Sequence, residues 1–334
     1  MEFGSDEQVI SYGTSQVLAG TVIIKMGIVE KVRGGEGMLQ SIRPKKRVIF
    51  AYLVIPTILF IFAVFVPLLT ALVNSFYEWK GGPNKTFNGI ENYKQLLSDS
   101  IFWLSFRHNL FLVAVCIIGQ IGIAFILVLM INSRLVKLKG IHRTFGFFPS
   151  TIAAVSIGFI WTMVYDYNRG ILNWFLDKIG RADLQQVWLN NEKWVMFLVA
   201  IPLVWQWIGY YMVIILSAIS AIDTEIFEVA ELDGANAIQR AIYIVLPLIK
   251  NTLLVCMTLC IAGNMKAFDN IYVMTSGGPG RASMVMAMYG YKVSFGQGNL
   301  GYGSTISVGI FVMSLLVIGG SQWIIGLLGK EKEA

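Results

Sequence analysis

Six stretches of mostly apolar residues, each long enough to cross a lipid bilayer, dominate this chain. A helix needs about 20 such residues to cross the hydrocarbon core. The stretches do not alternate between apolar and polar residues, as the strands of a membrane β-barrel do. The sequence therefore predicts an all-α membrane protein with six transmembrane helices. We expect these spans over residues 48–73, 105–131, 145–166, 194–220, 248–275 and 303–328.

The composition excludes a water-soluble domain of this size. Of the 334 residues, 56% are hydrophobic and 14% are charged, and the mean hydropathy is +0.66. An ordinary globular domain has about one-quarter charged residues, so this chain has too few polar side chains to cover a water-facing surface. The net charge of +6 fits basic residues at the cytoplasmic ends of membrane spans, and we expect lipid and not nucleic acid around the protein.

The basic residues also predict how the spans are oriented. One cluster precedes the first span and another lies between the second and third spans, and by the positive-inside bias both belong in the cytoplasm. Their members are Arg43, Lys45, Lys46, Arg47, Arg134, Lys137, Lys139 and Arg143. The loops after the first and third spans mix acidic and basic residues and are expected outside. With six spans, both termini and the loop at residues 222–247 are then cytoplasmic.

The first 44 residues are expected to form a cytoplasmic extension ahead of a six-span domain at residues 45–330. The extension has no apolar run of span length, and its basic cluster follows its apolar part, which is the reverse of a signal peptide. The plain interpretation is a disordered tail. An alternative comes from RGGEGM at Arg33–Met38, which a purine-rich ribosome-binding site and a start codon can encode. On that hypothesis residues 1–37 are not native protein, and the codons for Arg33–Gly35 test it.

An acidic segment interrupts the apolar pattern between the fourth and fifth spans. Asp223 or Thr224 can cap a first short helix, and Gly234 suits the left-handed residue that ends it. A second helix can begin at Asn236, because Gln239 three residues later completes a capping box. A helix of about three turns is unstable alone in water, so the first helix is expected to need a partner. Anionic lipids repel its carboxylates, which favours a protein partner over a connector lying on the membrane.

The residues of this segment resemble a known signature. With the spacing of the EAA signature of ABC-importer permeases, the chain has Glu228, Val229, Ala230, Gly234, Ile244, Leu246 and Pro247. Val229 in place of the first alanine is the one departure. The resemblance implies that the first helix is a coupling helix that docks in a cleft of a cytoplasmic ATPase. It also implies that Glu228 makes polar contacts in the cleft, that Ala230 permits close approach, and that Gly234 allows the sharp turn.

Two further stretches resemble sugar-uptake permeases. KAFDNIYVMTSGGPG at Lys266–Gly280, and GIENYKQLLSD after the first span, are similar to permeases of the maltose and glycerol-phosphate type, in particular to the first of their two dissimilar permease subunits. The likeness covers about residues 45–328. It implies an importer of a sugar, expected to be an oligosaccharide, in a bacterial cytoplasmic membrane. The implied partners are a second homologous permease, a cytoplasmic ABC ATPase dimer and an extracytoplasmic sugar-binding protein.

The sequence contains no motif for chemistry of its own. It lacks the glycine-rich P-loop, so ATP and magnesium are expected on the partner ATPase, with no cofactor in this chain. Its two histidines, His108 and His142, lie near span ends and form no metal-ligand cluster. The three cysteines, Cys116, Cys256 and Cys260, fall in apolar runs and are interpreted as small buried hydrophobes. We therefore expect a transport subunit and not an enzyme.

Polar residues within the spans mark candidates for the substrate path, because such residues are costly in lipid. With one aromatic, they are Gln120, Trp205, Gln206, Asn264, Lys266, Asp269 and Asn270. Amides and carboxylates suit sugar hydroxyls, and aromatic faces suit sugar rings. Plainer interpretations exist, since Lys266 can snorkel to the outer interface, and Trp205 and its neighbour Trp207 can be packing aromatics. Lys266 and Asp269, three residues apart, are expected to share a helix face and can pair.

Two questions stay open at the level of sequence. Gly277, Gly278 and Pro279 end the fifth span in a flexible turn outside the membrane, which is either a docking site for the binding protein or a plain loop. The alternative function is an ion-coupled carrier or a membrane enzyme acting on lipid-linked sugars. A carrier predicts internal repeats and charges near the midplane, and such an enzyme predicts acidic or histidine clusters. The sequence has neither.

Overall fold

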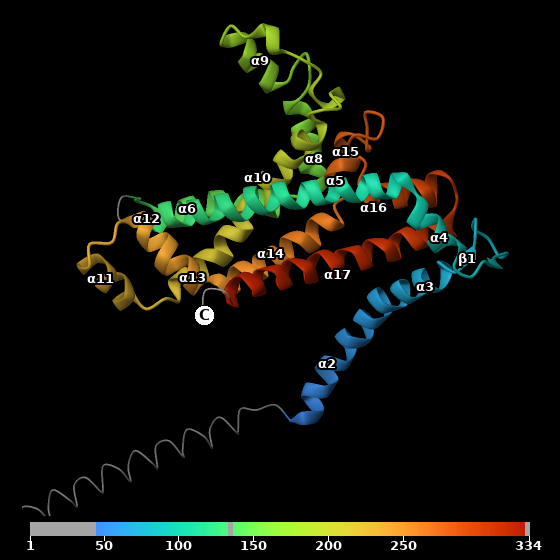
Figure 1. Ribbon diagram of the computed structural model, residues 1–334, viewed down its shortest axis with the longest axis horizontal. Coiled ribbons are helices and arrows are strands. Elements are labelled where there is room, and N and C mark those ends of the chain that lie inside the picture. Colours follow the sequence, from blue (N-terminus) through green and yellow to red (C-terminus); the bar gives the residue numbers. More distant parts are fainter. Residues whose placement is uncertain (1–44, 133–135, 331–334) are drawn as a thin grey trace, which may run out of the picture. The chain divides into compact units, whose positions relative to one another are not determined.

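The computed structural model describes residues 45–132 and 136–330, and its regular structure is helical apart from one short hairpin (Figure 1). In chain order the helical elements are α2 (Lys46–Phe60), η1 (Ile61–Phe65), α3 (Val66–Asn74), α4 (Glu91–Ser98), α5 (Ser100–Cys116), η2 (Ile117–Gly122), α6 (Ile123–Asn132), α7 (Lys139–Phe147), η3 (Phe148–Thr151), α8 (Ala154–Val164), α9 (Ile171–Lys178), η4 (Ala182–Leu184), η5 (Trp188–Asn190), α10 (Val195–Ser220), α11 (Thr224–Leu232), α12 (Ala237–Gln239), η6 (Arg240–Val245), α13 (Leu246–Leu248), α14 (Lys250–Met265), α15 (Asp269–Met274), α16 (Met286–Tyr291), η7 (Lys292–Gly296) and α17 (Leu300–Lys330). The strands β1 (Tyr77–Glu78) and β2 (Thr86–Phe87) pair antiparallel, with Tyr77 opposite Phe87. The predicted N-terminal extension, with the hypothesis about residues 1–37, lies outside the described residues.

Within the described residues, five helices are long and apolar enough to cross a membrane. They are Lys46–Asn74, Ser100–Asn132, Val195–Ser220, Lys250–Met274 and Leu300–Gly326. These five agree with the first, second, fourth, fifth and sixth predicted spans to within about five residues at each end. The structure therefore supports the predicted class, an all-α membrane protein.

The predicted third span, residues 145–166, is not one straight helix. It falls on the pair Lys139–Thr151 and Ala154–Val164, which are bent by 98° relative to each other. The bend arises because Ile152 and Ala153 have ψ values of 139° and 137°, outside the helical range. The described residues thus contain five candidate spans, or six when the bent pair is taken as one broken span.

The chain divides into two units, residues 1–68 and 69–334. The described part of the first unit is one continuous helix made of α2, η1 and the start of α3. Pro56 lies inside α2, where it removes one backbone hydrogen bond, and the five-residue π-helix η1 follows. The sequence of this helix is apolar on all sides, as a lipid-exposed span requires.

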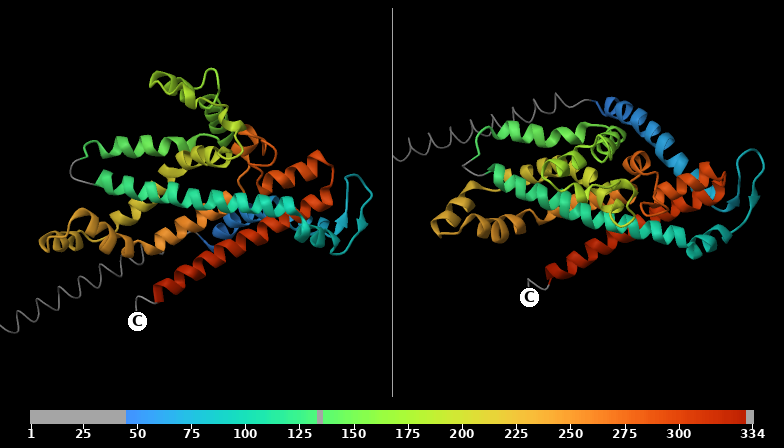
Figure 2. Two further views of the ribbon diagram at one scale, coloured as in Figure 1. Left: turned by 45° about the horizontal axis from the view of Figure 1, so that its top comes forward. Right: turned by 90° about the horizontal axis from the view of Figure 1, so that it is seen from above.

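Helix α10 is central to the second unit. It packs against α5, α6 and α7 and also against α14 and α15, while α17 packs along α14 and α16 (Figures 1 and 2). Pro202 lies inside α10 and, lacking an N–H, leaves the carbonyl oxygen of Leu198 without its helical partner. The hydroxyl of Tyr165 donates to that oxygen at 3.1 Å, so the proline is accommodated by a contact from outside the helix.

Helices α7 and α10 meet at two glycines. A Cβ added at Gly209 would lie 1.9 Å from the carbonyl oxygen of Gly146, so only a hydrogen fits between the two backbones. This close approach fixes how α7 is seated on α10 and, through the bend after α7, where α8 begins.

Candidate functional site

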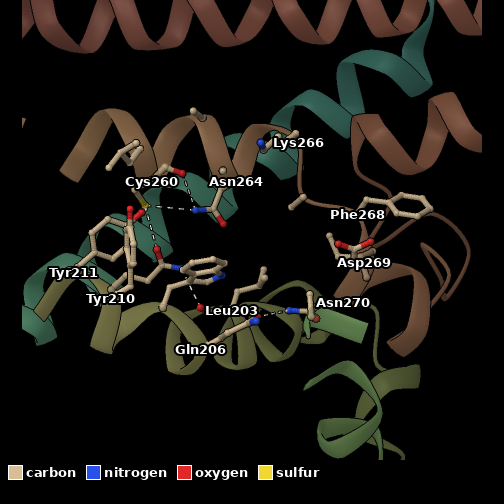
Figure 3. A pocket seen from close by; sticks show the side chains of 18 residues that line it. Leu203, Gln206, Tyr210, Tyr211, Cys260, Asn264, Lys266, Phe268, Asp269 and Asn270 are labelled. Atoms are coloured by element: carbon tan, nitrogen blue, oxygen red, sulfur yellow. Dashed lines mark hydrogen bonds between the residues drawn. The ribbon is translucent and has the colours of Figure 1, made fainter. Parts of the chain in front are cut away.

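A cavity of about 630 Å³ opens in the second unit between η2, α8, α10 and the α14–α15 region (Figure 3). Six of the seven residues predicted for the substrate path contribute to its wall. They are Gln120, Gln206, Asn264, Lys266, Asp269 and Asn270. Residues from three spans, up to 150 positions apart in the sequence, thus converge on one hollow.

Trp205 is the predicted residue that the structure places elsewhere. Its ring lies 6.1 Å from that of Trp161, edge to face, and it does not line the cavity, whereas Trp207 does. Two residues apart on a helix lie about 200° apart around the axis, so the two tryptophans of α10 face different surroundings. Tyr210, Tyr211 and Phe268 complete the aromatic part of the wall.

Gln120 lies within η2, the π-helical segment of the second span, and is 1% exposed. Its Nε2 donates to the carbonyl oxygen of Leu203 on α10 at 3.0 Å. The Sγ of Cys260 approaches its Oε1 at 3.4 Å. The side chain therefore links the second, fourth and fifth spans at the cavity wall.

Gln206 forms a hydrogen bond with the backbone at the bend in the third predicted span. It is 2% exposed, and its Nε2 donates to the carbonyl oxygen of Ile152 at 3.0 Å. That oxygen belongs to the extended residues between α7 and α8. A polar group in a membrane interior needs a partner. The carbonyl oxygen left free at the bend and the side-chain amide of Gln206 therefore act as hydrogen-bond partners for each other.

Asn270 meets Gln206 from the fifth span. Its Nδ2 donates to the Oε1 of Gln206 at 3.4 Å (Figure 3). Asn270 is 3% exposed, and its buried Oδ1 has no hydrogen-bond partner. A buried acceptor without a donor is uncommon and calls for an explanation.

The fifth span is broken at the cavity. Helix α14 ends at Met265 and α15 begins at Asp269, with Lys266 and Phe268 outside helical geometry. The expectation that Lys266 and Asp269 share a helix face is therefore wrong, because the helix stops between them. Both side chains are exposed, and no ion pair joins them in the described part of the chain.

Asn109 on α5 stabilises this break, and sequence analysis missed it. It is fully buried, and its Nδ2 donates to the carbonyl oxygens of Asn264 and Met265 at 2.8 and 3.2 Å. Its Oδ1 accepts from the backbone N–H of Met286 at 2.9 Å. A polar residue near the start of the second predicted span was the available signal, of a kind similar to the one that singled out Gln120.

Helix α11, between the fourth and fifth spans, carries the acidic segment (Figure 1). Gly234 follows it with φ +77°. The N–H of Ala235 donates to the carbonyl oxygen of Ala230 at 2.9 Å, and that of Gly234 to Glu231 at 3.1 Å. These two bonds form a Schellman motif, and the predicted left-handed glycine at the helix end is confirmed.

The predicted capping box after Gly234 is also confirmed. Asn236 and Gln239 exchange two side-chain-to-backbone hydrogen bonds, both of 2.9 Å. Asp223 occupies the N-cap position of α11 but its side chain makes no capping bond. Pro247 lies in α13, at the end of the helical stretch Ala237–Leu248 and just ahead of α14.

The signature residues differ in exposure. Glu228 and Val229 are exposed, while Ala230 is 6% exposed and faces the protein. Of the others, Gly234, Leu246 and Pro247 are exposed and Ile244 is half-buried. Leu232, at the end of α11, is 88% exposed. Exposed carboxylates beside exposed apolar side chains suit a protein partner better than water or anionic lipid.

The loop at residues 277–279 is tied to its surroundings by hydrogen bonds. Gly277 is buried at φ +82° against the side chain of Met284. The Oγ of Ser283 donates to the carbonyl oxygen of Gly278 at 2.6 Å. The N–H of Ala282 donates to the carbonyl oxygen of Pro279 at 2.9 Å. Gly278 and Pro279 are half-buried, so only part of this predicted docking surface is reachable from outside.

The cysteines and histidines lie as the sequence suggested. Cys116, Cys256 and Cys260 are free and buried, and Cys260 lines the cavity. The Nδ1 of His108 lies 2.8 Å from the carbonyl oxygen of Met284, and His142 is exposed. No group of metal-ligating side chains occurs among the described residues.

Comparison with known proteins gives consistent matches. The family described as "Binding-protein-dependent transport system inner membrane component" matches residues 122–328, more than half of the chain. A probable ABC transporter permease protein of Pyrococcus horikoshii is 35% identical, over 73% of this chain and 84% of that protein. The trehalose/maltose transport system permease protein MalF of Thermococcus litoralis is 32% identical, over 70% and 78%.

Solved structures share the fold. A chain of a bacterial ABC transporter involved in the import of the acidic polysaccharide alginate superimposes with a TM-score of 0.73, at 19% identity, covering 84% of this chain and 95% of that one. A chain of a bacterial alginate ABC transporter in complex with its alginate pentasaccharide-bound periplasmic protein gives 0.71, at 20% identity, over 82% and 92%. The chain therefore belongs to the family of binding-protein-dependent transport system inner membrane components, and it is an integral-membrane permease subunit of an ABC transporter and not an enzyme.

Proposed function

We propose that the chain is the permease subunit of a bacterial ABC importer for a sugar, expected to be an oligosaccharide. The observation that carries the proposal is the cavity in which Gln120, Gln206, Asn264 and Asn270 meet aromatic faces. Amide groups can bind sugar hydroxyls and aromatic faces can cover the C–H surfaces of sugar rings. A relative named for trehalose and maltose transport supports the same substrate class.

The energy is proposed to come from a separate cytoplasmic ATPase, which would hold the ATP and magnesium. Helix α11 is the proposed coupling helix, because it combines the signature residues with an exposed outer face and a turn at Gly234. A movement of the ATPase would push on α11, and the chain continues from α11 through α12 and α13 into the fifth span. That span includes the break beside the cavity.

The remaining partners and the topology belong to the same proposal. One six-span chain has too few helices to enclose a path for an oligosaccharide, so a second homologous permease would complete the cavity. The bent pair α7–η3 and α8 would form one span, the third along the chain, and bring the number of spans to six. Both termini would then lie in the cytoplasm of a bacterial cell. A sugar-binding protein would deliver the substrate to the outer face, where the exposed part of the 277–279 loop is the docking candidate.

Co-expression with the neighbouring ATPase gene tests the coupling role. Replacing Gly234 by Ala strains the left-handed turn, and we expect less ATPase to co-purify and a several-fold lower sugar-stimulated ATP hydrolysis. Glu228→Lys is expected to act in the same direction. Gly180→Ala is the matched control, because Gly180 also has a positive φ, +73°, and open space around it, but lies after α9. Unchanged coupling in both Gly234→Ala and Glu228→Lys would overturn the assignment of α11.

A further inference from the structure

We propose that the cavity wall of this chain takes a neutral, polyhydroxylated saccharide and rejects oligosaccharides of uronic acids. The inference rests on the proposed function, because it names the substrate class of the same site. It also separates this chain from two of the solved structures that share its fold, which belong to alginate transporters.

The amide nitrogens of the wall already donate within the protein. The Nε2 atoms of Gln120 and Gln206 donate to backbone carbonyl oxygens at 3.0 Å each. The Nδ2 of Asn264 donates to the carbonyl oxygen of Cys260 at 2.9 Å, and the Nδ2 of Asn270 donates to Gln206. These hydrogen bonds stabilise the breaks and crossings of the helices, so each of the four amides has at least one N–H engaged before a ligand arrives.

The groups left for a ligand include several acceptors beside the ammonium group of Lys266. The Oδ1 of Asn270 is buried and has no partner, and within the described residues no hydrogen bond reaches the Oδ1 of Asn264. The carboxylate of Asp269 is exposed beside them. A buried acceptor gains most from a ligand that donates a hydrogen bond. Sugar hydroxyls donate, whereas a carboxylate only accepts.

The charges of the wall point the same way. Among its lining residues Lys266 is the one cation and Asp269 the one anion, so this side of the cavity has no net charge. An oligouronate carries one negative charge on each sugar unit and needs an excess of cations to replace the water it loses. The faces of Trp207 and Phe268, in contrast, suit the C–H surfaces of a neutral ring.

A retention experiment tests the inference. The membrane complex is purified through a tag on this chain and incubated with a pool of neutral di- and trisaccharides from starch, cellulose and xylan. A second sample receives oligouronates of the same lengths from pectin and alginate, and the retained sugars are identified by mass spectrometry. We expect retention from the neutral pool, at least about tenfold above the uronate pool, which corresponds to about 1.4 kcal/mol.

Charge variants sharpen the test. Asp269→Asn removes the anion and leaves Lys266 unbalanced, so retention of oligouronates is expected to rise about fivefold, which corresponds to the roughly 1 kcal/mol that one exposed charge contact can contribute. Lys266→Gln is the matched control. It removes the cation and keeps the anion, so it gives no rise in the retention of oligouronates. Both side chains are exposed at the helix break, and neither forms an ion pair with another described residue.

The outcomes distinguish the inference from the proposed function. Equal or stronger retention of oligouronates by the unaltered complex overturns the inference, while sugar transport stands. The same holds if Asp269→Asn leaves uronate retention unchanged. If neither pool is retained and neither stimulates ATP hydrolysis, the sugar assignment itself fails, and the inference fails with it.

Discussion

The side-chain amide of Asn109 donates a 2.8 Å hydrogen bond to the backbone carbonyl oxygen of Asn264, and through this contact the second span holds the break in the fifth. The end of a helix leaves carbonyl oxygens without partners, and in a membrane no water is present to satisfy them. Asn109 satisfies two of them and also the N–H of Met286. The polar wall of the cavity therefore depends on a residue that does not line it.

Replacing Asn109 by Leu is expected to destabilise the break. The carbonyl oxygen of Met265 and the N–H of Met286 lose their partner, while the carbonyl oxygen of Asn264 keeps a 3.3 Å hydrogen bond from the N–H of Ala267. Each buried unsatisfied group costs about 1–3 kcal/mol. We expect a lower melting temperature and, in variants that still assemble, a several-fold higher half-saturation for sugar-stimulated ATP hydrolysis. A purely structural role would lower the amount of folded protein and leave the half-saturation unchanged, so titration of the surviving complex separates the two roles.

The matched control is Ser105→Ala, one turn earlier on α5. Ser105 is fully buried, and its Oγ has no hydrogen-bond partner, so its removal breaks no bond. Its melting temperature and half-saturation should equal those of the unaltered protein. Equal losses in Ser105→Ala and Asn109→Leu would show that any change in this part of α5 is harmful, and would refute the specific role of Asn109.

Gly209→Ala is expected to separate α7 from α10. The added methyl would meet the carbonyl oxygen of Gly146 at 1.9 Å, and overpacking of this kind typically costs about 1–3 kcal/mol, and more where backbone cannot move. The melting temperature should fall by several degrees. Gly140→Ala on the same α7 has nothing within 4 Å of its added Cβ and should be neutral; a stable Gly209→Ala protein would contradict the observed helix contact.

Much of the architecture could be predicted because it depends on local sequence. Span length and apolar composition located five spans to within about five residues at each end. The turn after α11 was predicted in detail, since Gly234, Asn236 and Gln239 lie within six consecutive residues. The same local reasoning identified Gln206 as a residue that must find a partner in the membrane.

The breaks could not be predicted, because their stability comes from distant residues. Ile152 leaves the helical range with its carbonyl oxygen held by Gln206, 54 positions away, and the end of α14 is held by Asn109, 155 positions away. An unbroken helix was therefore assumed at Lys266 and Asp269. The choice between Trp205 and Trp207 failed for a related reason, since which face of α10 meets the cavity depends on the packing of other spans.

Asp99 is expected to make folding sensitive to acid. Its carboxylate accepts hydrogen bonds from the hydroxyls of Tyr289 and Tyr302 at 2.5 and 2.6 Å, and from two N–H groups at the start of α5. Burial alone would raise the pKa of this carboxyl, but the hydrogen bonds outweigh it and hold the pKa below its ordinary value. The stabilisation is then present above about pH 4 and is lost as the pH falls through the folded-state pKa.

Asp99→Asn tests this linkage. The variant should melt below the unaltered protein at pH 7, and the difference should narrow as the pH is lowered below about 4. Asp183→Asn is the control, because Asp183 forms an exposed ion pair with Arg181, and such pairs contribute little to stability. A gap between Asp99→Asn and the unaltered protein that stays constant with pH would show that Asp99 acts through shape and not through its charge.

The two tryptophans of α10 offer a comparison between neighbouring positions with different surroundings. Trp207 lines the cavity and Trp205 does not, although both are about equally exposed, 37% and 38%. Trp207→Ala is expected to weaken binding of a neutral oligosaccharide about fivefold, since an aromatic contact contributes about 1 kcal/mol. Trp205→Ala loses the edge contact with Trp161 and should lower the melting temperature while leaving the sugar affinity unchanged. The sugar affinity of both variants is measured by titrating the assembled complex with sugar and recording the half-saturation of ATP hydrolysis. A loss of sugar affinity in Trp205→Ala alone would mean that the substrate passes along the other face of α10.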